Sequence, residues 1–202
     1  TATQNAQSAH NTAVEAWEKA LASASSGGSL ILNGGFEQGL AEWGGDGELS
    51  TPGHTGDNAL KLTPESSAHQ TQTIPTSEGR VYLIGGWVKR LSGASTAGGS
   101  FTAEVSSPTS TETVNTGNVL EGVSSEWIKV SGKVTVALED ATELKFGLTL
   151  GAGDSVVAWD GLFAVDVTEA EAALAAAEEA RSRATAAEQA VAVAVVGSKV
   201  EY

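Results

Sequence analysis

The chain has 202 residues with 25 acidic and 11 basic side chains, a formal net charge of −14, and neither cysteine nor methionine. The missing cysteines exclude disulfides, thiolate metal sites and cysteine nucleophiles, and the acidic balance without a basic patch argues against a nucleic-acid partner. No apolar run approaches the ~18–20 residues that a membrane-spanning helix needs, so we expect no membrane insertion.

The length suits one ordinary domain with appendages, because a domain takes about 100–200 residues. A single hydrophobic core is therefore expected. No methionine stands at position 1 and no hydrophobic signal-peptide stretch follows it, so we expect the chain to be an excerpt of a longer polypeptide.

Residues 1–24 are predicted to form an α-helix, because alanines recur at steps of three and four and would lie along one seam. The seam comprises Ala2, Ala6, Ala9, Ala13, Ala16 and Ala20. A second stripe beside it comprises His10, Val14, Trp17, Leu21 and Ala24. Serine and glycine dominate residues 25–29, which we interpret as a flexible linker.

Residues 30–167 carry almost no helical pattern, and the 24 glycines of the chain indicate many turns. Alternation of apolar and polar residues predicts half-buried antiparallel strands at 128–138 and 143–150. Residues 81–88 and 156–165 are apolar on both parities, as expected for central strands that are covered on both faces. The region therefore predicts a mainly β fold, an antiparallel jelly-roll β-sandwich of about nine strands.

Residues 168–196 predict a second α-helix. Thr168 and Glu171 have capping-box spacing, and Val167 stands where a hydrophobic staple would. Small residues again recur at steps of three and four, at Ala170, Ala173, Ala177, Ala180, Ala184, Ala187, Val191 and Ala194. Residues 197–202 break this pattern and are interpreted as the start of a following element.

Both alanine seams have the periodicity of a coiled coil, so we expect the helices to associate with other copies of the chain. Because alanine buries little apolar area, this association should need support from a larger assembly. The alternatives are helices that fold back on their own sandwich and helices that remain exposed to solvent.

An ordered set of motifs runs through the predicted sandwich. It consists of Asn-Gly-Gly-Phe-Glu at 33–37, Trp43, Gly-x-x-Ala-Leu-Lys-Leu at 56–62, Tyr-x-x-x-Gly-Trp-Val-Lys at 82–89, Glu-Trp-x-Lys-Val-Ser-Gly at 126–132 and Trp-Asp at 159–160. In this order the motifs resemble the carbohydrate-binding modules of families 4, 9 and 22, over residues 30–167.

Set between alanine-rich helices, such a module resembles those in tail fibres and minor tail proteins of bacteriophages, particularly phages of high-GC Gram-positive hosts. The resemblance implies a virion tail location, a homotrimer built through the helices, and contacts with other tail proteins and with host cell-wall glycan. A secreted or cell-surface protein is the alternative. The first and last strands of this sandwich family are neighbours, so residues 30 and 167 should lie close together. The two helices would then emerge together, with the sandwich as a side branch.

Asp160 interrupts an otherwise apolar strand, where an unpaired carboxylate would be costly. Either backbone amides or a hard cation could satisfy it. Modules of the resembled type hold a structural calcium where the first and last strands meet. The resemblance implies Asp160 and Glu37 as side-chain ligands, with backbone carbonyls near Asn33 and Gly56 as helpers, and such oxygens suit calcium. In the other interpretation Asp160 is hydrogen-bonded or reaches solvent.

A sugar site needs exposed aromatic faces with polar neighbours. The resemblance places most of the tryptophans at positions that usually serve the core or its edges. Trp43 and Tyr82 remain as candidate platforms, with His69, Gln70 and Gln72 as hydrogen-bonding neighbours in the preceding strand. Tyr82 is equally well explained as a structural strand residue.

Catalysis has little support, because no nucleophile elbow, Walker loop or His-Glu-x-x-His motif appears. The three histidines are scattered, and His54 lies in a loop that could face solvent. We therefore expect a non-catalytic domain of a tail fibre or minor tail protein that contacts host glycan. The alternatives are an architectural spacer that binds nothing and an accessory module of a secreted polysaccharide hydrolase.

Overall fold

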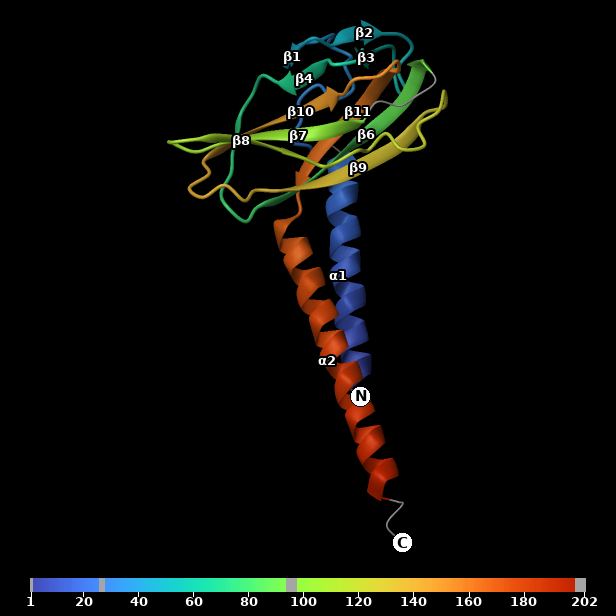
Figure 1. The fold of residues 1–202 in the computed structure, drawn as a ribbon, viewed down its shortest axis with the longest axis vertical. Helices are drawn as coiled ribbons and strands as arrows, with labels where there is room; N and C mark the ends of the chain where they lie inside the picture. The colour runs from blue at the N-terminus through green and yellow to red at the C-terminus, as the bar shows by residue number, and fades with distance from the viewer. Residues whose placement is uncertain (1, 26–27, 94–97, 199–202) are drawn as a thin grey trace. The chain divides into compact units, whose positions relative to one another are not determined.

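The computed structural model describes residues 2–25, 28–93 and 98–198, and in them eleven β-strands and two long α-helices (Figure 1). They divide into a helical unit, residues 1–22 and 167–202, and a sandwich unit, residues 23–166. The predicted antiparallel β-sandwich is confirmed. It has more strands than the nine or so expected, because three strands of two or three residues are too short to show alternation.

The sandwich consists of two antiparallel sheets (Figure 1). The first sheet has the order β1–β4–β10–β7–β8, and β5 also pairs with β10. Its strands are β1 (Trp43–Gly45), β4 (Ser67–Gln70), β5 (Ile74–Pro75), β7 (Gly99–Ser106), β8 (Thr111–Asn115) and β10 (Glu143–Leu150). The second sheet has the order β2–β3–β11–β6–β9. Its strands are β2 (Glu48–Ser50), β3 (Ala59–Leu62), β6 (Val81–Ser92), β9 (Ile128–Thr135) and β11 (Val156–Asp166).

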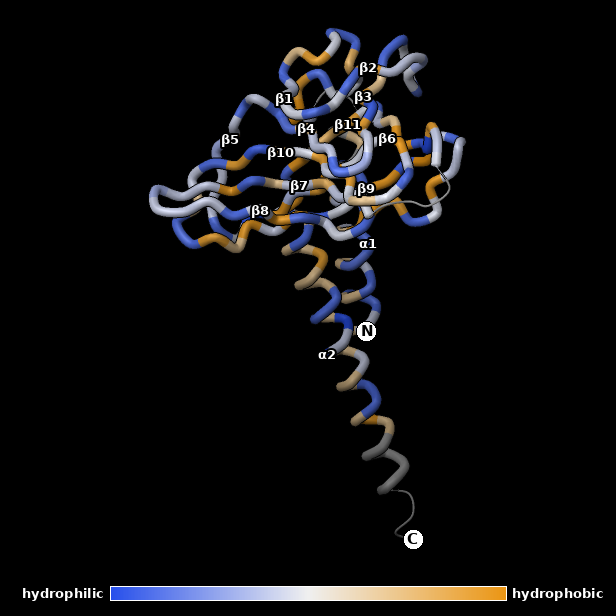
Figure 2. The backbone as a smooth tube through the Cα atoms, turned by 45° about the horizontal axis from the view of Figure 1, so that its top comes forward, coloured by the Kyte–Doolittle hydropathy of each residue, from blue (hydrophilic) through white to orange (hydrophobic). Residues whose placement is uncertain are grey.

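Strand β10 shows how the alternating sequence builds the core. Leu144, Phe146, Leu148 and Leu150 are buried between the sheets. Lys145 and Thr149, on the other parity, face outward, and the alternation can be followed along the tube in Figure 2. The outward parity of this sheet is therefore where polar side chains gather.

Strands β6 and β11 lie next to each other inside the second sheet, as their apolar sequences predicted. Ile84, Val88, Val157 and Trp159 point into the core. The chain enters the sandwich beside the strand by which it leaves, because the amide of Leu30 donates to the carbonyl of Ala164 at 2.8 Å. This agrees with the expected proximity of the two ends of the sandwich.

The helical unit contains α1 (Ala2–Ser25) and α2 (Thr168–Ser198), which lie side by side and run antiparallel (Figure 1). Ala6 and Ala13 of α1 are buried, as are Ala177 and Ala184 of α2. The indole Nε1 of Trp17 donates to Glu171 Oε1 at 2.7 Å. Periodicity does not identify the partner of a seam, and here part of each seam packs against the other helix of the same chain.

Of the remaining seam alanines whose side chains are described, Ala170 is half-buried and the others are exposed, at Ala2, Ala9, Ala16, Ala173, Ala180 and Ala187. Helix α2 begins at Thr168 as predicted and continues to Ser198. The predicted following element falls largely on residues 199–202, which lie outside the described residues. In the described part of the chain, neither helix is both long and apolar enough to cross a membrane.

Candidate functional site

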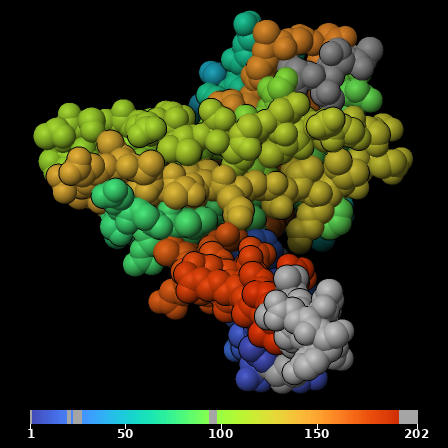
Figure 3. Space-filling model, turned by 60° about the horizontal axis from the view of Figure 1, so that its bottom comes forward, coloured from blue at the N-terminus to red at the C-terminus, as the bar shows by residue number. Residues whose placement is uncertain are grey.

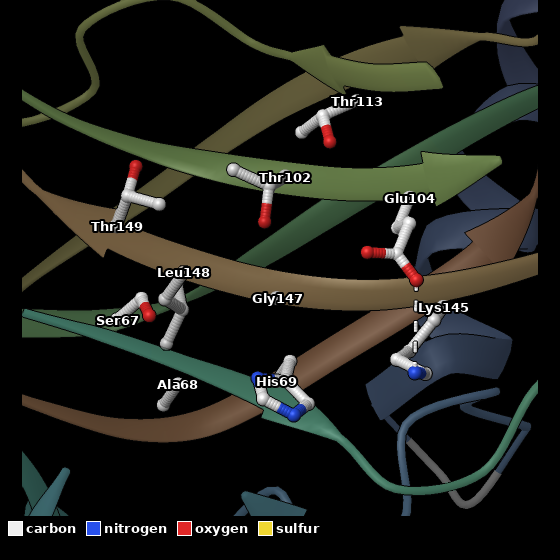
Figure 4. A pocket seen from close by; sticks show the side chains of 10 residues that line it. All are labelled: Ser67, Ala68, His69, Thr102, Glu104, Thr113, Lys145, Gly147, Leu148 and Thr149. Atoms are coloured by element: carbon white, nitrogen blue, oxygen red, sulfur yellow. Dashed lines mark ion pairs between the residues drawn. The ribbon is translucent and has the colours of Figure 1, made fainter. Parts of the chain in front are cut away.

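A pocket of about 240 Å³ lies on the outer face of the first sheet, across four neighbouring strands (Figure 4). It is lined by Ser67, Ala68, His69, Thr102, Glu104, Thr113, Lys145, Gly147, Leu148 and Thr149. Most of these side chains occupy the outward parity of their strands, opposite the buried residues described above. The alternation that makes the core therefore also makes the polar surface of the pocket.

Strand register arranges the lining residues in two rows. In the first row His69 pairs with Gly147, and Gly147 pairs with Thr102. In the second row Lys145 pairs with Glu104, and Glu104 pairs with Thr113. Residues from distant parts of the sequence are thereby placed at neighbouring positions across the sheet.

Two glycines allow the side chains of the first row to lie low on the sheet. A Cβ atom at Gly147 would lie 2.7 Å from Thr102 Oγ1, and one at Gly44 would lie 2.9 Å from His69 Nε2. Both distances are too short for real contacts, so a larger residue at either position would displace its neighbour. The shape of the pocket therefore depends on glycine at positions 147 and 44.

The pocket offers hydrogen-bonding groups of both kinds. Lys145 Nζ and Glu104 Oε1 are 3.7 Å apart and partly exposed, so their ion pair contributes little stability and leaves donors and acceptors at the surface. The hydroxyls of Ser67, Thr102 and Thr149 can each donate and accept (Figure 4). Such an array suits a ligand rich in hydroxyl groups.

Of the three predicted polar neighbours, His69 lines this pocket. Gln70 does not, because it is buried on the opposite parity, where its Oε1 accepts from the Leu32 amide at 2.9 Å and its Nε2 donates to the Leu32 carbonyl at 3.2 Å. Gln72 lies exposed beyond the end of β4. The structure therefore does not bring the three residues together.

Trp43 and Tyr82 do not serve as exposed platforms. Trp43 is 8% exposed, and its indole packs 5.2 Å from the ring of Phe36. Tyr82 is 3% exposed, with its ring edge-on to Phe146 and its hydroxyl 2.8 Å from Thr76 Oγ1. Burial raises the pKa of Tyr82, and the hydrogen bond with Thr76 opposes this rise. Both aromatic side chains are occupied in packing, and the structural interpretation of Tyr82 is the one observed.

Asp160 is fully buried, and backbone amides surround its carboxylate. Its Oδ2 accepts from the amides of His54 at 2.7 Å and Thr55 at 2.8 Å, and its Oδ1 accepts from the amide of Gly161 at 2.6 Å. Three donors satisfy a charge that would otherwise be costly in this position. The hydrogen-bonded alternative for Asp160 is therefore present in the structure.

Glu37 approaches the same loop from another part of the chain. Its Oε1 accepts from the amides of Asp57 and Asn58, both at 3.1 Å. Gly56 lies directly beneath, with a φ of +80° and space for no side chain, since a Cβ there would lie 2.4 Å from Glu37 Oε1. Asp160 and Glu37 thus hold one loop, residues 54–58, with their carboxylates.

The predicted calcium ligands fit only in part. Two carboxylates beside one loop have the oxygen chemistry that calcium prefers, but an ion here would also need carbonyl oxygens of that loop. Asn33 is not suited to help, because its carbonyl already accepts from Trp43 Nε1 at 3.2 Å and from the Phe36 amide at 3.1 Å. Among the described residues, no three His, Cys, Asp or Glu side chains gather where they could hold a metal.

Sequence reasoning identified one polar residue of the pocket, His69, and missed the others: Ser67, Thr102, Glu104, Thr113, Lys145 and Thr149. Lys145 and Thr149 lie on the outward parity of the predicted strand 143–150, which marks any exposed sheet face, whereas the strands that carry Thr102, Glu104 and Thr113 were not predicted. The sequence analysis placed His54 in a loop that could face solvent. In the structure its ring stacks on Trp87, with ring centroids 3.9 Å apart.

The sequence matches the model of a carbohydrate binding domain family, of the family 4 and 9 type, over residues 28–156. No curated protein sequence matches the chain.

Several solved structures share the fold. A xylan-binding domain of family 22 is 13% identical, with a TM-score of 0.54 over 70% of this chain and 97% of that one. The C-terminal family 22 module of Clostridium thermocellum Xyn10B is 12% identical, with a TM-score of 0.53 over 69% and 94%. The enzymatically active domain of tailspike protein 4 from bacteriophage CBA120 is 13% identical, with a TM-score of 0.50 over 69% of this chain and 21% of that one.

Proposed function

Because this chain belongs to the carbohydrate binding domain family, we propose that its sandwich binds glycan, without catalysis, in the pocket on the outer face of the first sheet. The pocket carries this proposal, since it gathers hydroxyl, imidazole, carboxylate and ammonium groups from four strands. Sugar hydroxyls both donate and accept hydrogen bonds, and each kind of partner is available there.

The binding mode follows from what lines the pocket. Among the described residues that line it, His69 alone carries a ring, so hydrogen bonds rather than stacking on a large aromatic face would hold the sugar. Each neutral hydrogen bond contributes only about 0.5–1.5 kcal/mol, because it replaces a bond to water. We therefore propose weak binding to each glycan segment.

The test is titration calorimetry with xylo- and gluco-oligosaccharides, after a glycan array has identified which class binds. Thr102→Val keeps the side-chain shape and removes one hydroxyl, so the affinity should fall roughly two- to tenfold. Thr135→Val, an exposed threonine in β9 of the other sheet, is the matched control and should bind like the wild type. An array without hits, or equal affinities for both variants, would contradict the proposal.

We further propose that the domain belongs to a phage tail fibre or minor tail protein, in which the helices set the oligomer and the sandwich contacts the host surface. The tailspike structure shares the sandwich fold, and a helical pair flanks the sandwich in this sequence. A virion tail is then the location, with other tail proteins as partners.

Self-association is supported by a groove of about 650 Å³ on the helical pair. Its walls include the exposed alanines Ala9, Ala16, Ala173, Ala176 and Ala180. Small side chains allow another helix to approach closely, so we propose that a helix of a second copy lies there.

Two other functions fit the same fold. In an accessory module of a secreted polysaccharide hydrolase the pocket would bind the substrate of a neighbouring catalytic domain, and the similarity to a xylan-binding domain of family 22 supports this alternative. In an architectural spacer it would bind nothing. Adjoining sequence that encodes a catalytic domain would favour the accessory module, and an empty glycan array would favour the spacer.

A further inference from the structure

A second cavity, of about 380 Å³, lies on the outer face of the other sheet, and it shares no lining residue with the first pocket. Successive side chains of a strand point to opposite faces of the sheet. Val88 of β6 points into the core, so its neighbour Trp87 points outward and lines the cavity. Lys129 is the register partner of Trp87 in the edge strand β9 and lines the cavity beside it. A volume in the range of ~300–1,000 Å³ is typical of ligand pockets.

Two aromatic side chains line this cavity: Trp87, which is partly exposed, and Phe163, which is 6% exposed. Phe163 lies over the backbone of β6, since a Cβ at Gly85 would be 2.5 Å from Phe163 Cζ. Trp87 is held in place by His54, whose ring stacks on it at 3.9 Å with an interplanar angle of 14°. His54 does not line the cavity, so it supports the indole without filling the space. Aromatic surfaces fixed in this way lose little entropy on binding.

Positive charge gathers on the two paired strands that supply Trp87 and Lys129 to this cavity, in an otherwise acidic chain. Residues 30–167 contain 17 acidic and 7 basic side chains. Four of the seven, Lys89, Arg90, Lys129 and Lys133, lie on the paired strands β6 and β9, which contain no acidic residue. Lys129 Nζ stands 5.4 Å from the centroid of the Phe163 ring. Figure 3 shows the segment around strand β9, in yellow, on the molecular surface.

One acidic group, Asp160, lies close behind the cavity, since a Cβ at the lining residue Gly35 would be 3.8 Å from its Oδ1. Asp160 is fully buried behind the lining, and three amides already bind its two oxygens. Lys129 is the single charged residue that lines the cavity in the described part of the chain. An anion that entered would therefore meet an ammonium group first.

We propose that this cavity binds a carboxylate-bearing sugar, a uronic acid residue of a glycan. The apolar C–H face of the sugar ring lies against Trp87 and Phe163, and its carboxylate accepts a charge-assisted hydrogen bond from Lys129. This site lies on the opposite sheet from the first pocket and does not depend on glycan binding there.

The probes are methyl β-D-glucuronide and its neutral counterpart methyl β-D-glucoside, titrated into the full chain and followed by the indole N–H resonances of the tryptophans. The glucuronide should shift the Trp87 resonance and bind more tightly than the glucoside. Lys129→Gln should weaken the glucuronide about tenfold or more, as expected for a hydrogen bond to a charged group. Lys133→Gln, on the same strand and face, removes an equal charge away from the cavity and should change affinity little.

A second pair of variants tests the space itself. A Cβ at Gly35 would have Asp160 Oδ1 as its nearest contact, at an ordinary 3.8 Å, so Gly35→Ala should fold and bind as the wild type does. Gly35→Leu should fill the cavity and abolish binding of the glucuronide. The melting temperatures of Gly35→Ala and Gly35→Leu show whether both variants are folded. Equal binding of glucuronide and glucoside, equal losses in Lys129→Gln and Lys133→Gln, or full binding by a folded Gly35→Leu would each overturn the proposal. Thr102→Val, in the first pocket, should leave the glucuronide affinity unchanged.

Discussion

Asp160 shows how one residue can organise a region that its own sequence neighbours do not reveal. The carboxylate is fully buried, and it binds the amides of residues 54 and 55, more than a hundred positions earlier in the chain. Its presence in an apolar strand predicted that something must satisfy it. The local sequence could not tell whether amides or a cation would do so, because the answer depends on a loop brought in by the fold.

Calcium binding at this loop is a first prediction. If Asp160, Glu37 and loop carbonyls hold Ca²⁺, an excess of about 100-fold over Kd adds ~2.7 kcal/mol to the free energy of unfolding. That gain corresponds to roughly 5–10 °C in melting temperature for a protein of this size. Calorimetry should show the rise with CaCl₂, its reversal by EDTA, and its loss in Glu37→Gln. If neither calcium nor EDTA changes the melting temperature, the calcium prediction is wrong and the backbone amides alone satisfy Asp160.

Tyr82 gives a second prediction, on pH dependence. Burial raises its pKa above the ordinary 10.0, so the folded protein holds the phenolic proton more firmly than the unfolded chain does. The stability from this group is fully present below pH 10 and is lost as the pH rises through the raised pKa. Urea titrations should therefore show a steeper fall in unfolding free energy above pH 10 for the wild type than for Tyr82→Phe.

The variants at Tyr82 and its partner separate titration from the hydrogen bond. At neutral pH, Tyr82→Phe should lower the free energy of unfolding by about 0.5–1.5 kcal/mol, because the hydrogen bond with Thr76 is lost. Thr76→Val loses the same bond but keeps the phenol, so its alkaline instability should persist. Parallel pH curves for wild type and Tyr82→Phe would show that Tyr82 does not cause the dependence.

At the scale of elements, local sequence patterns predicted both helices and, of the described strands of eight residues or more, β6, β9, β10 and β11 but not β7. Strand β10 carries four buried apolar residues on one parity, and α2 begins at the residue with the cap signal. The pocket on the first sheet could not be predicted in the same way, because Thr102, Glu104 and Lys145 meet only through strand register. The partner of the helix seams could not be predicted either, since Ala13 and Ala177 have a periodicity that is compatible with any helical partner.

The pairing of α1 with α2 yields the third prediction. Ala177 is buried between the two helices, so the larger side chain of Ala177→Leu should overpack this contact. The free energy of unfolding should fall by about 1–3 kcal/mol. Ala175→Leu, exposed on the same helix, has a nearly equal helix propensity change and should cost little. Thermal unfolding followed by helical circular dichroism compares the two. If both variants unfold alike, the two helices do not pack through this seam.

At the scale of the whole molecule, the two compact units differ in how much hydrophobic stabilisation each has of its own. The sandwich has a large core of its own that includes Trp159, Phe101 and Phe146. The helical pair buries mainly alanines, with the Trp17–Glu171 hydrogen bond at one end, and gains little hydrophobic stabilisation. The unit with less internal stabilisation is the one expected to gain most from assembly.

Assembly is therefore the last prediction. Light scattering on the full chain should give the mass of a trimer, and the mass should fall to that of a monomer when the groove is blocked. Ala16→Lys combined with Ala176→Lys places two charges in the groove at exposed positions, so each chain should still fold. Lysines at Ala172 and Ala175, exposed positions of α2 that do not line the groove, add the same charge and should leave the trimer intact. A wild-type monomer at high concentration would contradict self-association through the helices, and a trimer that survives the groove variant would place the interface elsewhere.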